Sequence, residues 1–169
     1  MIRSPGILLI LMFCCVLSSS CGYSFGPAAG KRDTIVVGMF ANATREPLLE
    51  KDLTNLVISE LMRSPAFTPI EKMDVSQLSL EGELVRYRSS AVAYNSSDAI
   101  TRYLVTVAAE VTLREEPNGR VVWKGQTEAA QEYPANSDKA VQRQLEEQAR
   151  LAALERLAEE IIRHLEHRF

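Results

Sequence analysis

The stretch ITRYLVTVAAEVTLRE, residues 100–115, alternates apolar and polar side chains along its whole length. One set of alternate positions is apolar and consists of Tyr103, Val105, Val107, Ala109, Val111 and Leu113. The other set includes Arg102, Thr106, Glu110, Thr112 and Arg114. A period of two places these sets on opposite faces of a β-strand. The stretch therefore predicts a long strand with one buried face.

The segment before this strand, LSLEGELVRYR at residues 78–88, alternates in the same way but changes phase. Apolar residues or glycine occupy the even positions as far as Leu84, and the apolar set then moves to Val85 and Tyr87. A slip of one residue exchanges the two faces of a strand, so this change predicts a β-bulge near Leu84 and Val85. The polar run YNSSD at residues 94–98 predicts the turn between the two strands.

The segment after it, RVVWKGQTEAAQEY at residues 120–133, is predicted to return as the second arm of another hairpin. The connecting residues 116–119, EPNG, are typical of a hairpin turn. Alternation predicts that Val121 and Trp123 face inward. The side chains predicted to face outward are Lys124, Gln126 and Glu128.

The first half of the chain predicts a strand, a helix and a short edge strand. TIVVGMF at residues 34–40 is rich in β-branched residues and predicts a buried strand. Apolar residues at helical spacing predict an amphipathic helix over about 47–63, with Pro47 at its first position. The AFTPI segment, residues 66–70, predicts a brief edge strand, because Pro69 cannot donate a hydrogen bond to an interior ladder.

A long helix is predicted from about residue 137 to residue 167, with Ser137 or Asp138 as its N-cap. The simplest way to bury all the apolar faces is an α+β fold. We therefore expect a mostly antiparallel sheet of about four strands, with two helices packed on one face.

The N-terminus has the pattern of a secretory signal. Arg3 precedes an apolar run at residues 7–17, and three serines then lead to Cys21. The other two cysteines lie in the apolar run, so Cys21 is the single cysteine of the predicted mature chain. We expect Cys21 to be acylated as in bacterial lipoproteins, and Gly22 favours the outer membrane. An ordinary signal peptide followed by a stray thiol is the alternative.

These features predict three parts of the chain. Residues 1–20 are the lipoprotein signal peptide, residues 21–32 are the acylated N-terminus and tether, and residues 33–169 are a single α+β domain. The 169-residue chain has a net charge of −3 and no basic block, which argues against nucleic acid as a partner. The 2 histidines are too few for a plausible metal site, and no catalytic motif is present in the sequence. We therefore expect neither an enzyme nor a cofactor.

Several motifs occur together and in a particular order. They are CGYSF at 21–25, IVVGMFANATREPLLEKDLTNLVISEL at 35–61, LEGELVRYRSSAVAY at 80–94, TRYLVTVAAEVTLRE at 101–115 and GRVVWKGQ at 119–126. This order resembles the LptE family of lipoproteins, as a divergent, non-enteric member. The resemblance covers nearly all of the predicted mature chain.

The resemblance implies a non-enzymatic protein of the outer membrane. LptE-like proteins sit as a plug inside the LptD barrel, and the pair places lipopolysaccharide in the outer leaflet. Acyl chains such as palmitate on Cys21 would then hold the chain on the periplasmic side. An alternative with a similar early strand, N-x-T motif and helix is a lipoprotein that regulates an envelope enzyme, such as a peptidoglycan synthase.

Three arginines are candidate contacts for lipopolysaccharide, because arginine recognises phosphate groups well. Arg86, Arg88 and Arg102 lie on opposing arms of the predicted hairpin, where they can share one end of the sheet. The alternatives are a solvated surface or cross-strand pairing with glutamate. Tyr103 and Trp123 are interpreted as core residues rather than ligand platforms.

Overall fold

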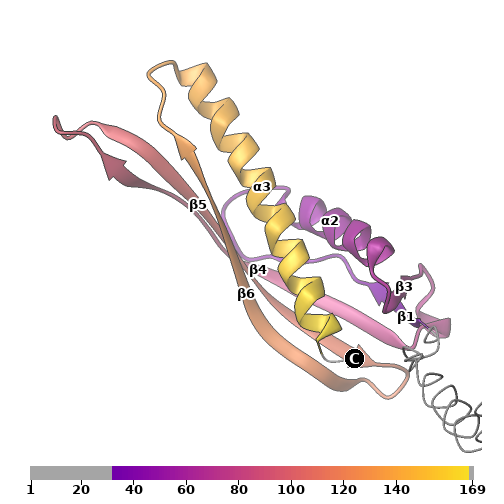
Figure 1. Ribbon diagram of the computed structural model, residues 1–169. Helices are drawn as coiled ribbons and strands as arrows, with labels where there is room; N and C mark the ends of the chain where they lie inside the picture. Colours follow the sequence, from indigo (N-terminus) through magenta and orange to yellow (C-terminus); the bar gives the residue numbers. More distant parts are fainter. Residues whose placement is uncertain (1–31, 168–169) are drawn as a thin grey trace, which may run out of the picture. The chain divides into compact units, whose positions relative to one another are not determined.

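The computed structural model describes residues 32–167, where six strands form one sheet and two α-helices pack against it (Figure 1). The strands are β1 (Asp33–Val37), β2 (Ala41–Asn42), β3 (Phe67–Pro69), β4 (Leu78–Tyr94), β5 (Ile100–Glu115) and β6 (Arg120–Pro134). The helices are α2 (Leu49–Arg63) and α3 (Lys139–Glu166), and a 3₁₀ turn spans Met73–Val75. The α+β class and the two helices on one face agree with the prediction.

The strands β4, β5 and β6 form an antiparallel meander, as the alternating patterns predict. Residues 95–99 and 116–119 make the two connections. The register of β4 against β5 shifts between Leu84 and Arg86, which confirms the predicted bulge. Before and after it, different sets of β4 residues face the helices: Leu80 and Leu84 pair with Leu113 and Ala109, and Tyr87 pairs with Val107.

The prediction of a mostly antiparallel sheet of about four strands needs correction. The strand order is β3-β1-β4-β5-β6, and β1 runs parallel to both β3 and β4. The short β2 also pairs with β4 in parallel. Parallel neighbours need a long crossover, so no hairpin turn marks them in the sequence. Ile35, for example, lies opposite Leu78.

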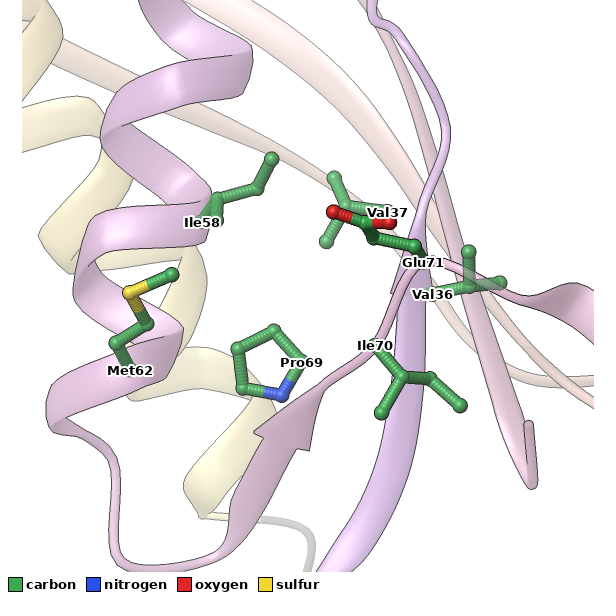
Figure 2. Close-up of a pocket in the computed structure, with 7 residues that line it drawn as sticks. All are labelled: Val36, Val37, Ile58, Met62, Pro69, Ile70 and Glu71. Atoms are coloured by element: carbon green, nitrogen blue, oxygen red, sulfur yellow. The ribbon is translucent and has the colours of Figure 1, made fainter. Parts of the chain in front are cut away.

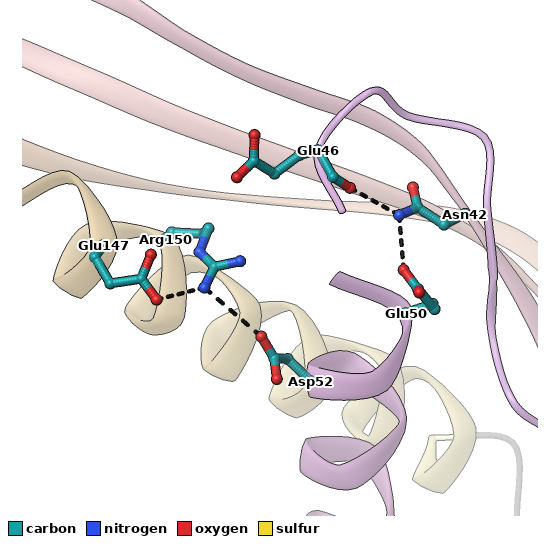
Figure 3. Close-up of polar contacts among 6 residues, drawn as sticks. All are labelled: Asn42, Glu46, Glu50, Asp52, Glu147 and Arg150. Atoms are coloured by element: carbon teal, nitrogen blue, oxygen red, sulfur yellow. Dashed lines mark hydrogen bonds and ion pairs between the residues drawn. The ribbon is translucent and has the colours of Figure 1, made fainter. Parts of the chain in front are cut away.

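Helix α2 begins two residues later than predicted, because an asparagine-centred loop sets its start (Figure 3). The side-chain oxygen of Asn42 accepts hydrogen bonds from the backbone N–H (3.0 Å) and the hydroxyl (2.7 Å) of Thr44. Its amide nitrogen donates to the carbonyl oxygen of Glu46 at 2.8 Å and the carboxylate of Glu50 at 2.7 Å. Leu48, with φ of 68°, then turns the chain into the helix, so Pro47 stays in the loop.

Helix α3 starts at Lys139, where the carboxylate of Asp138 accepts hydrogen bonds from the backbone N–H groups of Ala140 and Val141. This confirms Asp138 as the N-cap. The buried residues of α3 begin only at Ala149. They join Leu49, Leu53, Val57 and Leu61 of α2 and the inward residues of β4 and β5 in one core.

The prediction that Val121 faces inward is wrong, because its side chain is 49% exposed. The β5–β6 register shifts between Leu113, opposite Trp123, and Arg114, opposite Val121. This bulge in the β5–β6 ladder exchanges the faces of β6 at that point. Trp123 does pack against the core, and Lys124, Gln126 and Glu128 are exposed as predicted.

Candidate functional site

The sheet has a polar face that points away from the helices, and we refer to it as the open face. Buried residues such as Val105, Val107 and Val111 occupy alternate positions of β5 on the helix side, so the positions between them form the open face. Its charged members are Glu81, Glu83, Arg86, Arg88, Arg102, Glu110, Arg114, Lys124, Glu128 and Glu132. All three predicted arginines therefore share one face.

Arg86 forms an ion pair with Glu128 although β5 lies between their strands. Both residues are register partners of Ala108, one on each side. The methyl group of Ala108 is short enough for the arginine to pass over it, and Ala108 is fully buried although it lies on the open face. A small residue on the central strand thus allows one ion pair to connect three strands.

Arg102 pairs with Glu132 at 3.1 Å, and Arg114 pairs with Glu81 at 3.5 Å. The alternative of cross-strand pairing with glutamate therefore describes Arg86 and Arg102. Within residues 32–167, Arg88 makes no ion pair. Of the three predicted arginines, Arg88 is therefore the one whose exposed guanidinium is available to an added anion.

The three arginines are not equally close. Arg86 and Arg88 are two residues apart on the same face of β4, a spacing of about 7 Å. Arg88 lies opposite Thr106, whereas Arg102 is four residues away from Thr106 along β5, about 13 Å. The arrangement is a close pair with Arg102 further toward the hairpin tip.

The helix-facing side carries a second polar group, which the sequence reading did not identify as a cluster. The hydroxyls of Ser89 and Tyr133 share a hydrogen bond of 2.9 Å, and Tyr133 stacks on Tyr103 with ring centroids 5.3 Å apart. Burial, together with the nearby carboxylates of Glu146 and Glu46, raises the pKa of the Tyr87 hydroxyl to about 12. The alternating positions of β4, β5 and β6 were the only signal that these residues share a face.

Tyr103 and Trp123 serve the core, as interpreted from the sequence. Both are partly buried and pack against the core cluster. Trp123 also stacks on His164 of α3, with ring centroids 6.1 Å apart.

Arg150 of α3 connects the two helices (Figure 3). Its guanidinium lies 3.8 Å from the carboxylate of Asp52 on α2 and also pairs with Glu147. Burial lowers the pKa of Arg150, but the hydrogen bond and charge of Glu147 outweigh this, so the pKa is raised overall. Arg150 thus contributes an ion pair between α3 and Asp52 of α2.

An apolar groove of about 410 Å³ lies between α2 and the edge of the sheet formed by β1 and β3 (Figure 2). Ile58 and Met62 of α2 line one side, and the Met62 side chain is 67% exposed. The opposite side is formed by Val36, Val37, Pro69, Ile70 and Glu71. The groove belongs to a different part of the sheet from the arginines.

The described part of the chain places no three His, Cys, Asp or Glu side chains where they could hold a metal ion. Across residues 32–167, no helix is sufficiently long and apolar to span a bilayer. The predicted signal peptide, Cys21 and the tether before Arg32 lie outside the described residues.

Comparison with known proteins places this chain in context. The model of the LptE family, described as lipopolysaccharide-assembly, matches residues 32–168. No curated protein matches the sequence.

Solved structures of lipoproteins and of unassigned proteins share the fold at low identity. A hypothetical protein from Chlamydia trachomatis has 9% identity and a TM-score of 0.59, covering 80% of this chain and 96% of its own. The rare lipoprotein B from Shewanella oneidensis has 11% identity and a TM-score of 0.58, with coverages of 80% and 95%. A protein from Xanthomonas campestris has 15% identity and a TM-score of 0.56, with coverages of 81% and 86%.

Proposed function

Since this chain belongs to the LptE family of lipopolysaccharide-assembly proteins, we propose that it is the plug and assembly partner of an LptD-type outer-membrane barrel. In this proposal residues 1–20 are removed as a signal peptide, and acyl chains on Cys21 hold residues 33–169 on the periplasmic side of the outer membrane. The domain then enters the barrel from that side and assists the insertion of lipopolysaccharide into the outer leaflet.

The observation that carries the proposal is the character of the open face. A large outer-membrane barrel has a polar interior, so its plug must present charged groups that remain satisfied when bulk water is partly excluded. Here Arg102 and Arg114 are already paired with glutamates on neighbouring strands, and Arg86 is paired with Glu128 across the intervening β5. Charges that are already paired cost less to enclose than unpaired charges, because an uncompensated buried charge is the more strongly penalised case.

The length of the sheet supports the same proposal. Strand β4 has 17 residues, which corresponds to about 55 Å of extended chain. The apolar band of an outer-membrane barrel is about 25 Å tall. The β4–β5 hairpin is therefore long enough to run along the whole of a barrel interior.

Arg88, with Arg86 beside it, is the proposed contact for the phosphates of lipopolysaccharide. Arg102 contributes a more distant contact nearer the hairpin tip. Phosphate is a good partner for these groups because the guanidinium can donate two parallel hydrogen bonds to it. Arg88 can donate to a phosphate without breaking an existing ion pair. Arg86 and Arg102 must first break their ion pairs with Glu128 and Glu132.

The test is affinity purification of the full chain from solubilised envelopes of its native host. We expect a large outer-membrane barrel to co-purify in stoichiometric amount. The triple variant Arg86→Glu, Arg88→Glu, Arg102→Glu should retain the barrel and lose bound lipopolysaccharide. Recovery of a peptidoglycan synthase or another envelope enzyme in place of a barrel would overturn the proposal in favour of a regulatory lipoprotein.

A further inference from the structure

Strand β6 is the last strand of the sheet, and three hydrogen bonds identify which of its backbone groups face outward. The N–H of Ala135 donates to the carbonyl oxygen of Thr101, so this odd-numbered residue points toward β5. The carbonyl of Ala130 accepts from Arg156 of α3 at 2.9 Å, and that of Glu132 accepts from the Gln131 side chain at 2.8 Å. Even-numbered residues of this part of β6 therefore direct their backbone groups away from the sheet.

The outward edge is protected at one end only. The carbonyl groups of Ala130 and Glu132 are occupied, as described above. Among the residues that the structure describes, the outward backbone groups of Lys124, Gln126 and Glu128 have no hydrogen-bond partner. These three residues are exposed. An unprotected strand edge is a template for pairing with another strand.

Helix α3 runs beside this edge without closing it (Figure 1). A groove of about 350 Å³ lies between α3 and residues 128–130 of β6, and Arg156, Glu159, Glu160 and Arg163 of α3 line its other side. The groove leaves room for the side chains of an added strand on the helix side of the sheet.

The charges on this edge match those of a second copy. If two β6 strands lie antiparallel with Gln126 opposite Gln126, Lys124 of each copy lies opposite Glu128 of the other. Opposite charges that face each other across antiparallel strands stabilise the pairing. Lysine on a strand edge normally opposes such pairing, but the twofold relation places each lysine opposite the carboxylate of Glu128, which can accept from the lysine as well as from Arg86 of its own copy. The same register makes all three outward residues hydrogen-bonded partners.

We propose that two copies of this chain pair through residues 124–128 of β6, about a twofold axis at Gln126. The pairing joins the two sheets edge to edge. The paired segment ends before Ala130, because the carbonyl oxygen of that residue already accepts a hydrogen bond from Arg156. The contact is small, so the dimer is weak and depends on protein concentration. This association is independent of a barrel partner.

The first experiment is cysteine cross-linking of the full chain in detergent solution. Residues opposite each other in a hydrogen-bonded antiparallel pair have Cα atoms about 5.5 Å apart, which suits a disulfide. Mild oxidation of the Gln126→Cys variant is therefore expected to give a covalent dimer. The Lys139→Cys variant, at an exposed position on α3, measures cross-linking by random collision. The unsubstituted chain measures any cross-linking through Cys21.

The second experiment compares sedimentation of the wild-type chain with that of Gln126→Pro and Lys124→Glu. Proline removes an outward N–H that β5 does not use, so the fold should remain while the dimer is lost. In Lys124→Glu, the new carboxylate of each copy lies opposite Glu128 of the other copy. The two repulsive pairs should also give a monomer. The proposal is overturned if wild type is monomeric at ~100 µM, if Gln126→Cys cross-links no faster than Lys139→Cys, or if Gln126→Pro still dimerises.

Discussion

The guanidinium of Arg86 on β4 and the carboxylate of Glu128 on β6 form an ion pair that passes over Ala108 on the strand between them. Arg88, two residues along the same face, forms no such pair among the described residues. The guanidinium of Arg88 is therefore free to bind an added anion, whereas that of Arg86 is already bound to a carboxylate. This difference can be tested directly.

For lipopolysaccharide binding, we expect Arg88→Gln to weaken affinity about two- to fivefold, because an exposed charged contact is worth at most about 1 kcal/mol. Glu128→Gln should have the opposite effect and strengthen binding, since it releases Arg86. Both effects should shrink at high salt, where charges beyond a few ångströms are screened. Titration of purified lipopolysaccharide onto each variant measures this. Equal affinities for wild type, Arg88→Gln and Glu128→Gln would remove the open face from the binding site.

For the core, truncation of Val107 or Val111 to alanine should lower the free energy of unfolding by roughly 1–3 kcal/mol. Both side chains are fully buried on the helix side of β5. The matched changes Thr106→Ala and Thr112→Ala, on the open face, should cost less. Denaturant midpoints of the four variants decide the matter, and larger losses for the threonine pair would mean that the two faces of β5 are exchanged.

Gly82 has no room for a side chain. A methyl group there would lie 2.2 Å from Cε1 of the Phe40 ring, which is itself buried and held by a hydrogen bond from its backbone N–H to Thr54. Gly82→Ala should therefore destabilise the domain by about 1–3 kcal/mol. Gly38→Ala is the matched control, because its nearest neighbour would be 3.5 Å away. Thermal melting that ranks the two variants equally would contradict the close approach of Phe40.

Tyr87 makes stability sensitive to alkaline pH. Its pKa is raised from 10.0 to about 12 in the folded protein, mainly by burial and then by Glu146 and Glu46. Because the unfolded chain loses this proton first, the contribution of the neutral hydroxyl is complete below pH 10 and declines between about pH 10 and pH 12. In Tyr87→Phe, the free energy of unfolding should fall less steeply over that interval. Parallel curves for wild type and variant would show that Tyr87 does not contribute.

Lipidation at Cys21 is a prediction from the N-terminal sequence. Cys21→Ala should leave the precursor uncleaved or mislocalised, because the variant lacks the single thiol that the predicted acylation requires. Intact-mass spectrometry of the membrane-extracted protein measures the modification directly. A free thiol on the mature wild-type chain would show that the leader is an ordinary signal peptide.

The antiparallel half of the fold could be predicted because its information is local. The alternation of β5, the phase change at Leu84 and the cap at Asp138 each depend on residues within a few positions of one another. The parallel half could not be predicted, since Ile35 finds its partners Leu78 and Pro69 only after the intervening helix has been placed. The start of α2 was misplaced for a similar reason. Proline at residue 47 is a good local signal, but the hydrogen bonds of Asn42 to Glu46 and Glu50 determine the actual boundary.

The candidate site was predictable only in outline. The shared face of Arg86, Arg88 and Arg102 follows from strand alternation once the bulges are known. The glutamate partners of Arg86 and Arg102 lie on β6, and Val121 shows why that strand could not be aligned from sequence. The run Val121–Val122–Trp123 is apolar at every position, so nothing in it marks the register shift opposite Arg114. The pairing of Arg86 with Glu128 also needs the small side chain of Ala108, whose importance appears only in three dimensions.

The position of β1 between β3 and β4 also constrains the order in which the chain can fold. Both neighbours of this first strand come later in the sequence, at Phe67–Pro69 and Leu78–Tyr94. The β4–β5–β6 meander, by contrast, can zip together from its own hairpins. The N-terminal strand therefore cannot complete its ladder until the chain is available at least as far as residue 80, which in the proposed export means that this much of it has crossed the membrane. In that proposal the strand that enters the periplasm first pairs only with residues that arrive after it.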